Sequence, residues 1–118
     1  MESILLIEDD PFLLDIYTTK LKEEGFSIDV ATGGEEGLRK LREKKFDLLV
    51  LDIVLPKIDG WEILEKIKNL KGLKIIILSN LGQKEEVEKG LRLGAEKYLI
   101  KAHYTPSEVV EEINKVLK

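Results

Sequence analysis

Acidic residues stand directly behind the first and third apolar runs of the chain. Glu8 and Asp9 follow Ile4–Ile7, and Asp52 follows Leu48–Leu51. An unpaired buried charge costs several kcal/mol, so an acid at the end of a buried strand needs a partner or a chemical role. Carboxylates gathered in one place repel one another unless a cation lies among them. Mg²⁺ suits such a site, because it binds carboxylate oxygens and keeps ligand positions open.

A hydroxyl and an amine stand at the ends of two further apolar runs. Ser79 follows Lys74–Leu78, and Lys101 follows Lys97–Ile100. A lysine attracts phosphoryl oxygens and a serine hydroxyl donates to them, so with the acids they could form an electrostatic clamp for phosphoryl transfer. A carboxylate can form an acyl phosphate, which makes Asp52 the candidate nucleophile. Taken singly, each residue is better explained as a loop acid, turn cap or surface cation, and only their joint position favours chemistry.

The elements that must position these residues alternate along the chain. Short apolar runs predict strands, and amphipathic stretches predict helices. The expected strands are Ile4–Ile7, Ser27–Ala31, Leu48–Leu51, Lys74–Leu78 and Lys97–Ile100. The expected helices are Pro11–Glu24, Glu35–Lys44, Trp61–Asn69, Lys84–Leu93 and Ser107–Leu117. Central strands that are apolar at every position are typical of a parallel sheet covered on both faces, so the predicted class is α/β.

The carboxyl ends of parallel strands meet at one edge of the sheet, where ligands of such folds bind. The acids, the serine and the lysine are therefore expected to converge there. Asp10 also has a structural role available, because with Pro11 it forms a helix start.

Composition narrows the function classes. The 118 residues suit one domain over 1–118, without room for a separate effector domain. The chain has no cysteine, which excludes thiolate metal sites and is compatible with a cytoplasmic protein. A net charge of −4 argues against direct nucleic-acid binding by this domain. The first apolar run stops at Glu8, so neither a signal peptide nor a membrane span is expected.

Four segments together resemble the receiver domain of two-component response regulators. They read ILLIEDDP, DLLVLDIVLPKIDGWEIL, IIILSN and GAEKYLIKAHYTPSEV, and the resemblance covers the whole chain. It implies a flavodoxin-like three-layer sandwich, with a five-stranded parallel sheet of order 2-1-3-4-5 and five helices. It also implies a signalling switch that is not an enzyme on other substrates, but phosphorylates and dephosphorylates itself with Mg²⁺.

The resemblance assigns a role to each acid. Asp52 matches the phosphoacceptor, and Glu8 and Asp9 match the acid pair that holds Mg²⁺. Asp9 is expected to bind the ion directly and Glu8 through water. The backbone carbonyl of Val54 matches the third protein ligand.

Three further residues match the family's response to phosphorylation. Lys101 matches the phosphate-binding lysine, Ser79 the switch hydroxyl and Tyr98 the aromatic switch. Ser79 is expected to move to the phosphoryl group and Tyr98 to turn inward. This would reshape the face formed by the fourth helix, fifth strand and fifth helix, which a downstream effector protein or domain would read.

The expected partner is a sensor histidine kinase or a histidine phosphotransfer protein. Phe12, Leu13 and Ile16 extend the apolar stripe of the first helix, and the family docks its kinase on this helix. Plain core packing explains the same three residues equally well. The resemblance leaves open whether phosphorylation also drives homodimer formation.

Two positions depart from the family pattern. Ala102 replaces the usual proline after the lysine, where the family has a cis peptide. A cis bond before a residue other than proline costs about 2.5–4 kcal/mol, so a trans bond or a remodelled loop is expected. Asn80 stands where the family most often has a small residue, within reach of a bound phosphoryl group.

Three other functions compete with this interpretation. A flavin phosphate would need a loop of backbone donors after the first strand, where this chain has acids that repel it. A metal-dependent phosphatase with an aspartyl nucleophile usually needs a second acid two residues on, where this chain has Val54. The third alternative is a degenerate receiver, which has the same fold but is not phosphorylated and binds its partners independently of phosphorylation.

Overall fold

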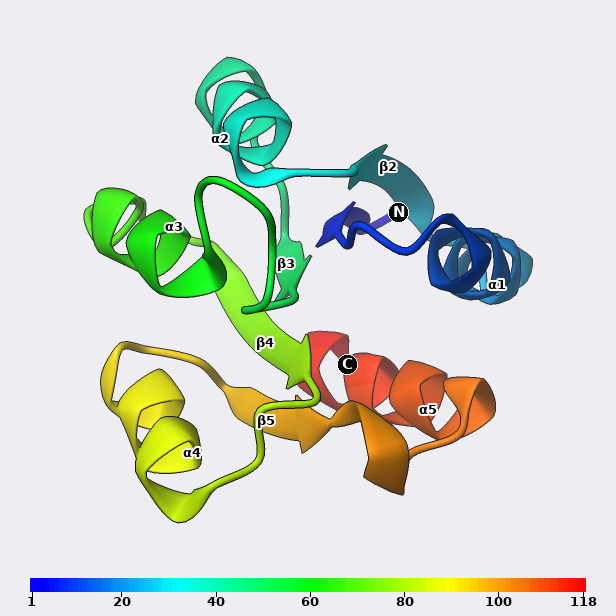
Figure 1. The fold of residues 1–118 in the computed structure, drawn as a ribbon. Coiled ribbons are helices and arrows are strands. Elements are labelled where there is room, and N and C mark those ends of the chain that lie inside the picture. The colour runs from blue at the N-terminus through cyan, green and yellow to red at the C-terminus, as the bar shows by residue number, and fades with distance from the viewer.

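The computed structural model describes residues 1–118 and contains one five-stranded parallel sheet. Its strand order is β2-β1-β3-β4-β5 (Figure 1), which confirms the predicted topology. The strands are β1 (Ser3–Ile7), β2 (Ser27–Ala31), β3 (Leu48–Leu51), β4 (Lys74–Ser79) and β5 (Lys97–Ile100).

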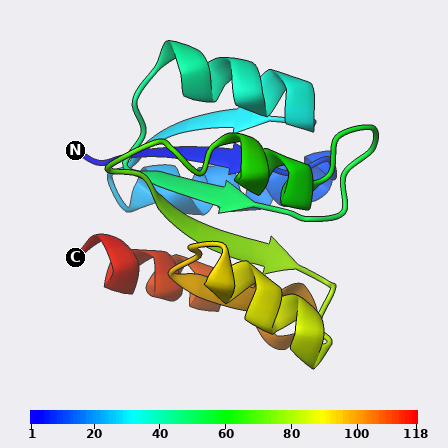
Figure 2. The same ribbon diagram turned by 90° about the vertical axis from the view of Figure 1, so that its left-hand side faces the viewer.

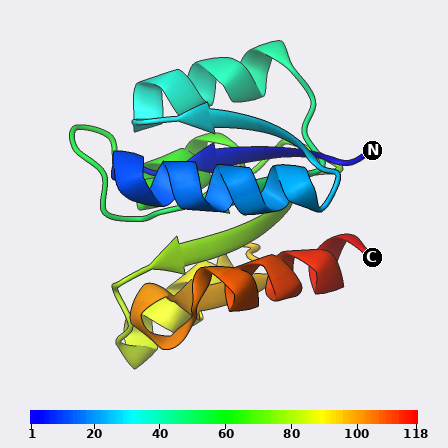
Figure 3. The same cartoon turned by 90° about the vertical axis from the view of Figure 1, so that its right-hand side faces the viewer.

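Five α-helices cover the sheet as two layers. They are α1 (Pro11–Glu23), α2 (Gly34–Glu43), α3 (Gly60–Lys66), α4 (Lys84–Arg92) and α5 (Pro106–Leu117). Helices α1 and α5 lie on one face, and α2, α3 and α4 lie on the other (Figure 1). The α1 and α5 layer is nearest the viewer in Figure 3, and the opposite layer in Figure 2. The flavodoxin-like sandwich is therefore confirmed.

Each face of the sheet has its own core. On β3, Leu49 and Leu51 belong to the cluster under α2 and α3, whereas Leu48 and Val50 belong to the cluster under α1 and α5. Successive strand residues point to opposite faces, so covering both faces requires an apolar residue at every position. This explains why β3 reads as an unbroken apolar run.

The helix boundaries differ from the predicted ones mainly at α3. This helix ends at Lys66 instead of Asn69, because residues 67–69 form a turn in which the N–H of Leu70 donates to the carbonyl of Ile67. The other predicted helix ends are displaced by one residue or not at all. A short 3₁₀ helix over Lys101–His103 was not predicted.

No peptide bond in the structure is cis, so the expected trans bond between Lys101 and Ala102 is confirmed. The chain leaves β5 directly into the 3₁₀ turn that begins at Lys101. The loop that departs from the family's cis-proline pattern thus begins at Lys101.

Gly60 fixes the end of β3 against the start of α3. Its N–H donates to the carbonyl of Ile53 over 2.8 Å. A Cβ at this position would lie 2.6 Å from the Cα of Ile53 and 2.7 Å from the carbonyl oxygen of Asp52. Only glycine allows this approach, and the approach holds the backbone that directly follows Asp52.

We expect Gly60→Ser to lower the free energy of unfolding by about 1–3 kcal/mol, because the new side chain must displace backbone atoms. Gly33→Ser is the matched control. A Cβ on Gly33 would meet no atom within 4 Å, and Gly33 is the N-cap of α2, where serine is a favourable residue. Denaturant unfolding of both variants measures the difference, and equal stabilities would contradict this account of Gly60.

Candidate functional site

A cavity of about 390 Å³ lies at the carboxyl edge of the sheet, between the segments that follow β1, β3, β4 and β5. Its lining consists of Glu8, Asp9, Asp10, Leu13, Asp52, Val54, Asn80 and Lys101. The structure therefore brings most of the residues singled out in the sequence to one place. Ser79 and Tyr98 are not among the lining residues.

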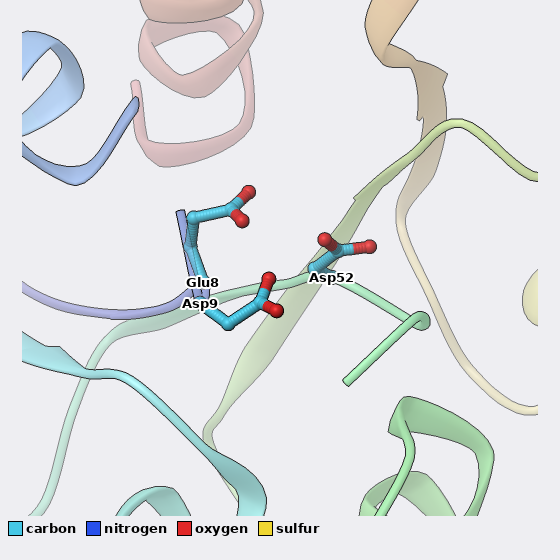
Figure 4. A group of neighbouring side chains, drawn as sticks. All are labelled: Glu8, Asp9 and Asp52. Carbon is cyan, nitrogen blue, oxygen red and sulfur yellow. The ribbon is translucent and has the colours of Figure 1, made fainter. Parts of the chain in front are cut away.

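Three carboxylates gather in this cavity (Figure 4). One oxygen from each of Glu8, Asp9 and Asp52 lies within 4.8 Å of the other two. Glu8 and Asp52 are buried, at 2% and 5% exposure, whereas Asp9 is exposed. This set of hard oxygen donors fits Mg²⁺, with the exposed side of the cluster open to further ligands.

Lys101 is the only cation paired with this cluster. Its Nζ lies 2.8 Å from Oδ2 of Asp52 and also donates to the carboxylate of Glu8. Burial alone would lower the pKa of Lys101, but its hydrogen bonds to Asp52 and Glu8 outweigh this effect and raise the pKa. The lysine is therefore held in its charged form.

One lysine does not neutralise two buried acids. Burial raises the pKa of Glu8, although the hydrogen bonds from Lys101 and from the N–H of Asp10 act in the opposite direction. Three carboxylates of the cluster thus lie beside a single ammonium, that of Lys101. The site is a ready receptor for added positive charge.

Backbone groups fix the second oxygen of each buried acid. The N–H of Asp10 donates to Oε2 of Glu8 over 3.0 Å, and the N–H of Val54 donates to Oδ1 of Asp52 over 3.1 Å. Asp10 itself caps α1, because its Oδ1 accepts from the N–H of Phe12 over 2.9 Å. Its structural role as a helix cap is thus confirmed.

Leu81 connects the two expected switch residues, and no sequence signal identified it. Ser79 is fully buried, and its Oγ accepts from the N–H of Leu81 over 3.3 Å. The hydroxyl of Tyr98 donates to the carbonyl of Leu81 over 2.5 Å. Both side chains therefore hold the backbone of one residue in the β4–α4 loop.

The three apolar residues of α1 differ in their surroundings. Phe12 is 71% exposed, whereas Leu13 packs against the core under α1 and Ile16 is half-buried. Phe12 is the only one of them that presents most of its side chain to solvent.

A family model for the response regulator receiver domain matches residues 4–114. The chain belongs to this family. A receiver domain is a signalling domain of two-component systems, and the acid cluster described above lies at the edge of the sheet that the resemblance assigns to the site.

Relatives of known role are transcriptional regulators. The receiver chain is 41% identical to AfsQ1 of Streptomyces coelicolor over 86% of its own length and 45% of the relative's. It is 34% identical to CusR of Escherichia coli over 98% of its length and 51% of the relative's. The chain thus spans about half the length of these relatives.

Solved receiver structures match nearly the whole chain. One from Methanospirillum hungatei has a TM-score of 0.92 at 33% identity, with 99% of this chain and 94% of that chain covered. TrrA of Thermotoga maritima, in complex with Mg²⁺–BeF, has a TM-score of 0.84 at 33% identity, with 98% of both chains covered. In this receiver none of the helices is both long and apolar enough to span a membrane.

The excess of negative charge in the acid cluster is expected to lower the stability of the receiver when no metal ion is bound. Asp9→Asn should raise the free energy of unfolding at pH 7 in EDTA by about 0.5–1 kcal/mol, because it removes repulsion on the exposed side of the cluster. Asp15→Asn is the control, since Asp15 is an exposed acid of α1 outside the cluster. Thermal or denaturant unfolding checks the expectation, and a loss of stability in Asp9→Asn alone would refute it.

Proposed function

We propose that this receiver is a phosphorylation-activated switch in which Asp52 accepts a phosphoryl group from a phosphohistidine. The observation that carries the proposal is the environment of Asp52. Its carboxylate is buried, held by the N–H of Val54 and the ammonium of Lys101, and still lines a cavity together with Glu8 and Asp9 of the acid cluster.

In the proposed step a carboxylate oxygen of Asp52 attacks the phosphorus atom. A P–O bond forms and the P–N bond of the donor phosphohistidine breaks, with its electron pair returning to the imidazole. Lys101 already contacts Oδ2 of Asp52, so it is placed to attract a phosphoryl oxygen on that side. The donor would belong to a histidine kinase or a histidine phosphotransfer protein.

Glu8, Asp9, Asp52 and the carbonyl of Val54 are the groups that would hold Mg²⁺. When bound there, the ion would neutralise charge that develops on the transferred phosphoryl oxygens. The chemistry of the donor set supports this assignment, because three carboxylates converge and the one lysine paired with the cluster contacts only two of them.

The proposed switch acts through Leu81. If Ser79 turns its hydroxyl toward a phosphoryl oxygen, the N–H of Leu81 loses its acceptor and the β4–α4 loop is free to move. Tyr98 already bonds the carbonyl of Leu81, so a moving loop carries or releases this side chain. Tyr98 also contacts α4, since a Cβ on Gly90 would lie 2.7 Å from its ring. The change would therefore reach the α4–β5–α5 face, where a downstream effector would bind.

We expect a mass increase of one phosphoryl group after incubation with acetyl phosphate and Mg²⁺, and none in EDTA. Asp52→Asn should abolish the increase, because the amide is not a nucleophile for this transfer, whereas Asp15→Asn should retain it. Intact-protein mass spectrometry reads the result. A folded wild-type protein that gains no phosphoryl group would support the alternative of a phosphorylation-independent interaction module, with Ala102 and Asn80 as the first residues to restore toward the family pattern.

We propose that kinase docking uses Phe12, with Leu13 and Ile16 as its supporting residues on α1. Phe12 and Val54 are large apolar side chains that stay exposed, at 71% and 55%, close to the site cavity. Phe12→Glu should slow phosphoryl transfer from a histidine kinase by about tenfold or more, and leave the rate with acetyl phosphate unchanged. Equal losses with both donors would contradict docking through Phe12, and Leu91→Glu on α4 is the control for a charge placed at another exposed apolar residue.

A further inference from the structure

A cavity larger than that of the acid cluster lies at the opposite end of the sheet, and the proposed function does not use it. It has a volume of about 500 Å³ and is formed by the α2–β3 loop, the α3–β4 loop and the start of β1. Both loops lie at the end of the sheet where the chain begins (Figure 2). We call it the basal cavity, and its volume is within the range of small-molecule sites, about 300–1,000 Å³.

The wall of the basal cavity is basic in a protein that is acidic overall. Lys44, Lys45 and Lys71 line it against a single acid, Asp47. The carboxylate of Asp47 is held at the start of β1, where its Oδ2 accepts from the N–H of Ser3 over 2.8 Å, and Lys44 is paired with Asp29 over 3.3 Å. Neither Lys45 nor Lys71 forms an ion pair within the protein, although the whole chain has a net charge of −4.

The lysines of the cavity wall are not needed to balance the partial negative charge at the carboxyl ends of α2 and α3. The last turn of α2 already carries Lys40 and Arg42, and that of α3 carries Lys66. Each helix end contributes roughly half a negative charge. Lys40 is paired with Asp29, but Arg42 and Lys66 form no ion pair and suffice to balance the two helix ends, so the charge of Lys45 and Lys71 beyond them is surplus.

The same loops present unused backbone donors. The N–H groups of Lys45, Phe46, Lys71, Gly72 and Leu73 donate no hydrogen bond to another atom of the protein. Successive free N–H groups next to cationic side chains are a common means of binding an oxyanion. The floor is apolar, because Leu41, Phe46, Leu70 and Leu73 also line the cavity.

We propose that the basal cavity binds a small molecule in which an oxyanion, carboxylate or phosphate, is attached to an apolar body. The lysines and free N–H groups attract the oxyanion, and the apolar floor contacts the body. A plain anion would leave the floor uncovered, and a neutral apolar molecule would leave the charges and donors unused. This inference is independent of phosphoryl transfer at Asp52, since the two sites lie at opposite edges of the sheet.

The test is a titration of the ¹⁵N-labelled protein with phenyl phosphate in EDTA, followed through its backbone amide shifts. Inorganic phosphate and benzyl alcohol are the comparison ligands, and benzoate tests whether a carboxylate replaces the phosphate. We expect saturable shifts confined to residues 44–47 and 69–73, with phenyl phosphate binding about tenfold more tightly than either comparison ligand.

The double variant Lys45→Ala/Lys71→Ala should weaken binding about tenfold, as expected for two exposed charges. Lys20→Ala/Lys22→Ala removes the same charge from α1, on the other face of the sheet, and should bind like the wild type. Shifts that do not saturate, that centre on the acid cluster, or that are equal in the two double variants would overturn the proposal. Equal affinity for phenyl phosphate and inorganic phosphate would overturn it as well, because it would remove the role of the apolar floor.

Discussion

The ion pairs of Lys101 are the interaction on which the arrangement of the site depends. Two buried acids from different strand ends, Glu8 and Asp52, share this one ammonium. Without it, each acid would be a buried charge with backbone donors alone, and a broken buried pair typically costs about 3–5 kcal/mol. The lysine therefore fixes the end of β5 to the ends of β1 and β3. It also leaves the three carboxylates of the site two positive charges short, which is the charge that a divalent cation supplies.

The covered sheet makes this interaction possible. Because helices pack on both faces, β1, β3 and β4 are buried up to their last residues, and a side chain just beyond them starts from a fixed position. Gly60 extends this control past the strand, since its close contact with Ile53 holds the backbone that follows Asp52. Apolar packing around the strand ends and Gly60 therefore sets the position of the Asp52 carboxylate.

The fold and the acid cluster could be predicted because they follow from local pattern. Apolar runs marked the strands, and parallel topology required that residues behind those runs, such as Asp52 and Lys101, meet at one edge. Leu81 could not be found in this way, because its role rests on its backbone N–H and carbonyl and not on its side chain. The basal cavity was missed for a similar reason. Lys45 and Lys71 are ordinary surface lysines in sequence, and only the fold shows that their loops adjoin and leave backbone donors free.

The distribution of charge along the sheet follows from the same parallel topology. Every helix returns antiparallel to the strands, so helix amino ends meet at the carboxyl edge and helix carboxyl ends at the other edge (Figures 2 and 3). The amino ends carry partial positive charge, which favours acids such as Asp10 and Asp59 that cap α1 and α3 there. Each helix has a basic residue in its last turn, which suits the opposite edge. An acidic pole and a basic pole thus arise from helix stability alone. A binding site needs more charge than the helix ends require. At the carboxyl edge this additional charge is on the acids around Lys101, and at the opposite edge it is on the lysines of the loops.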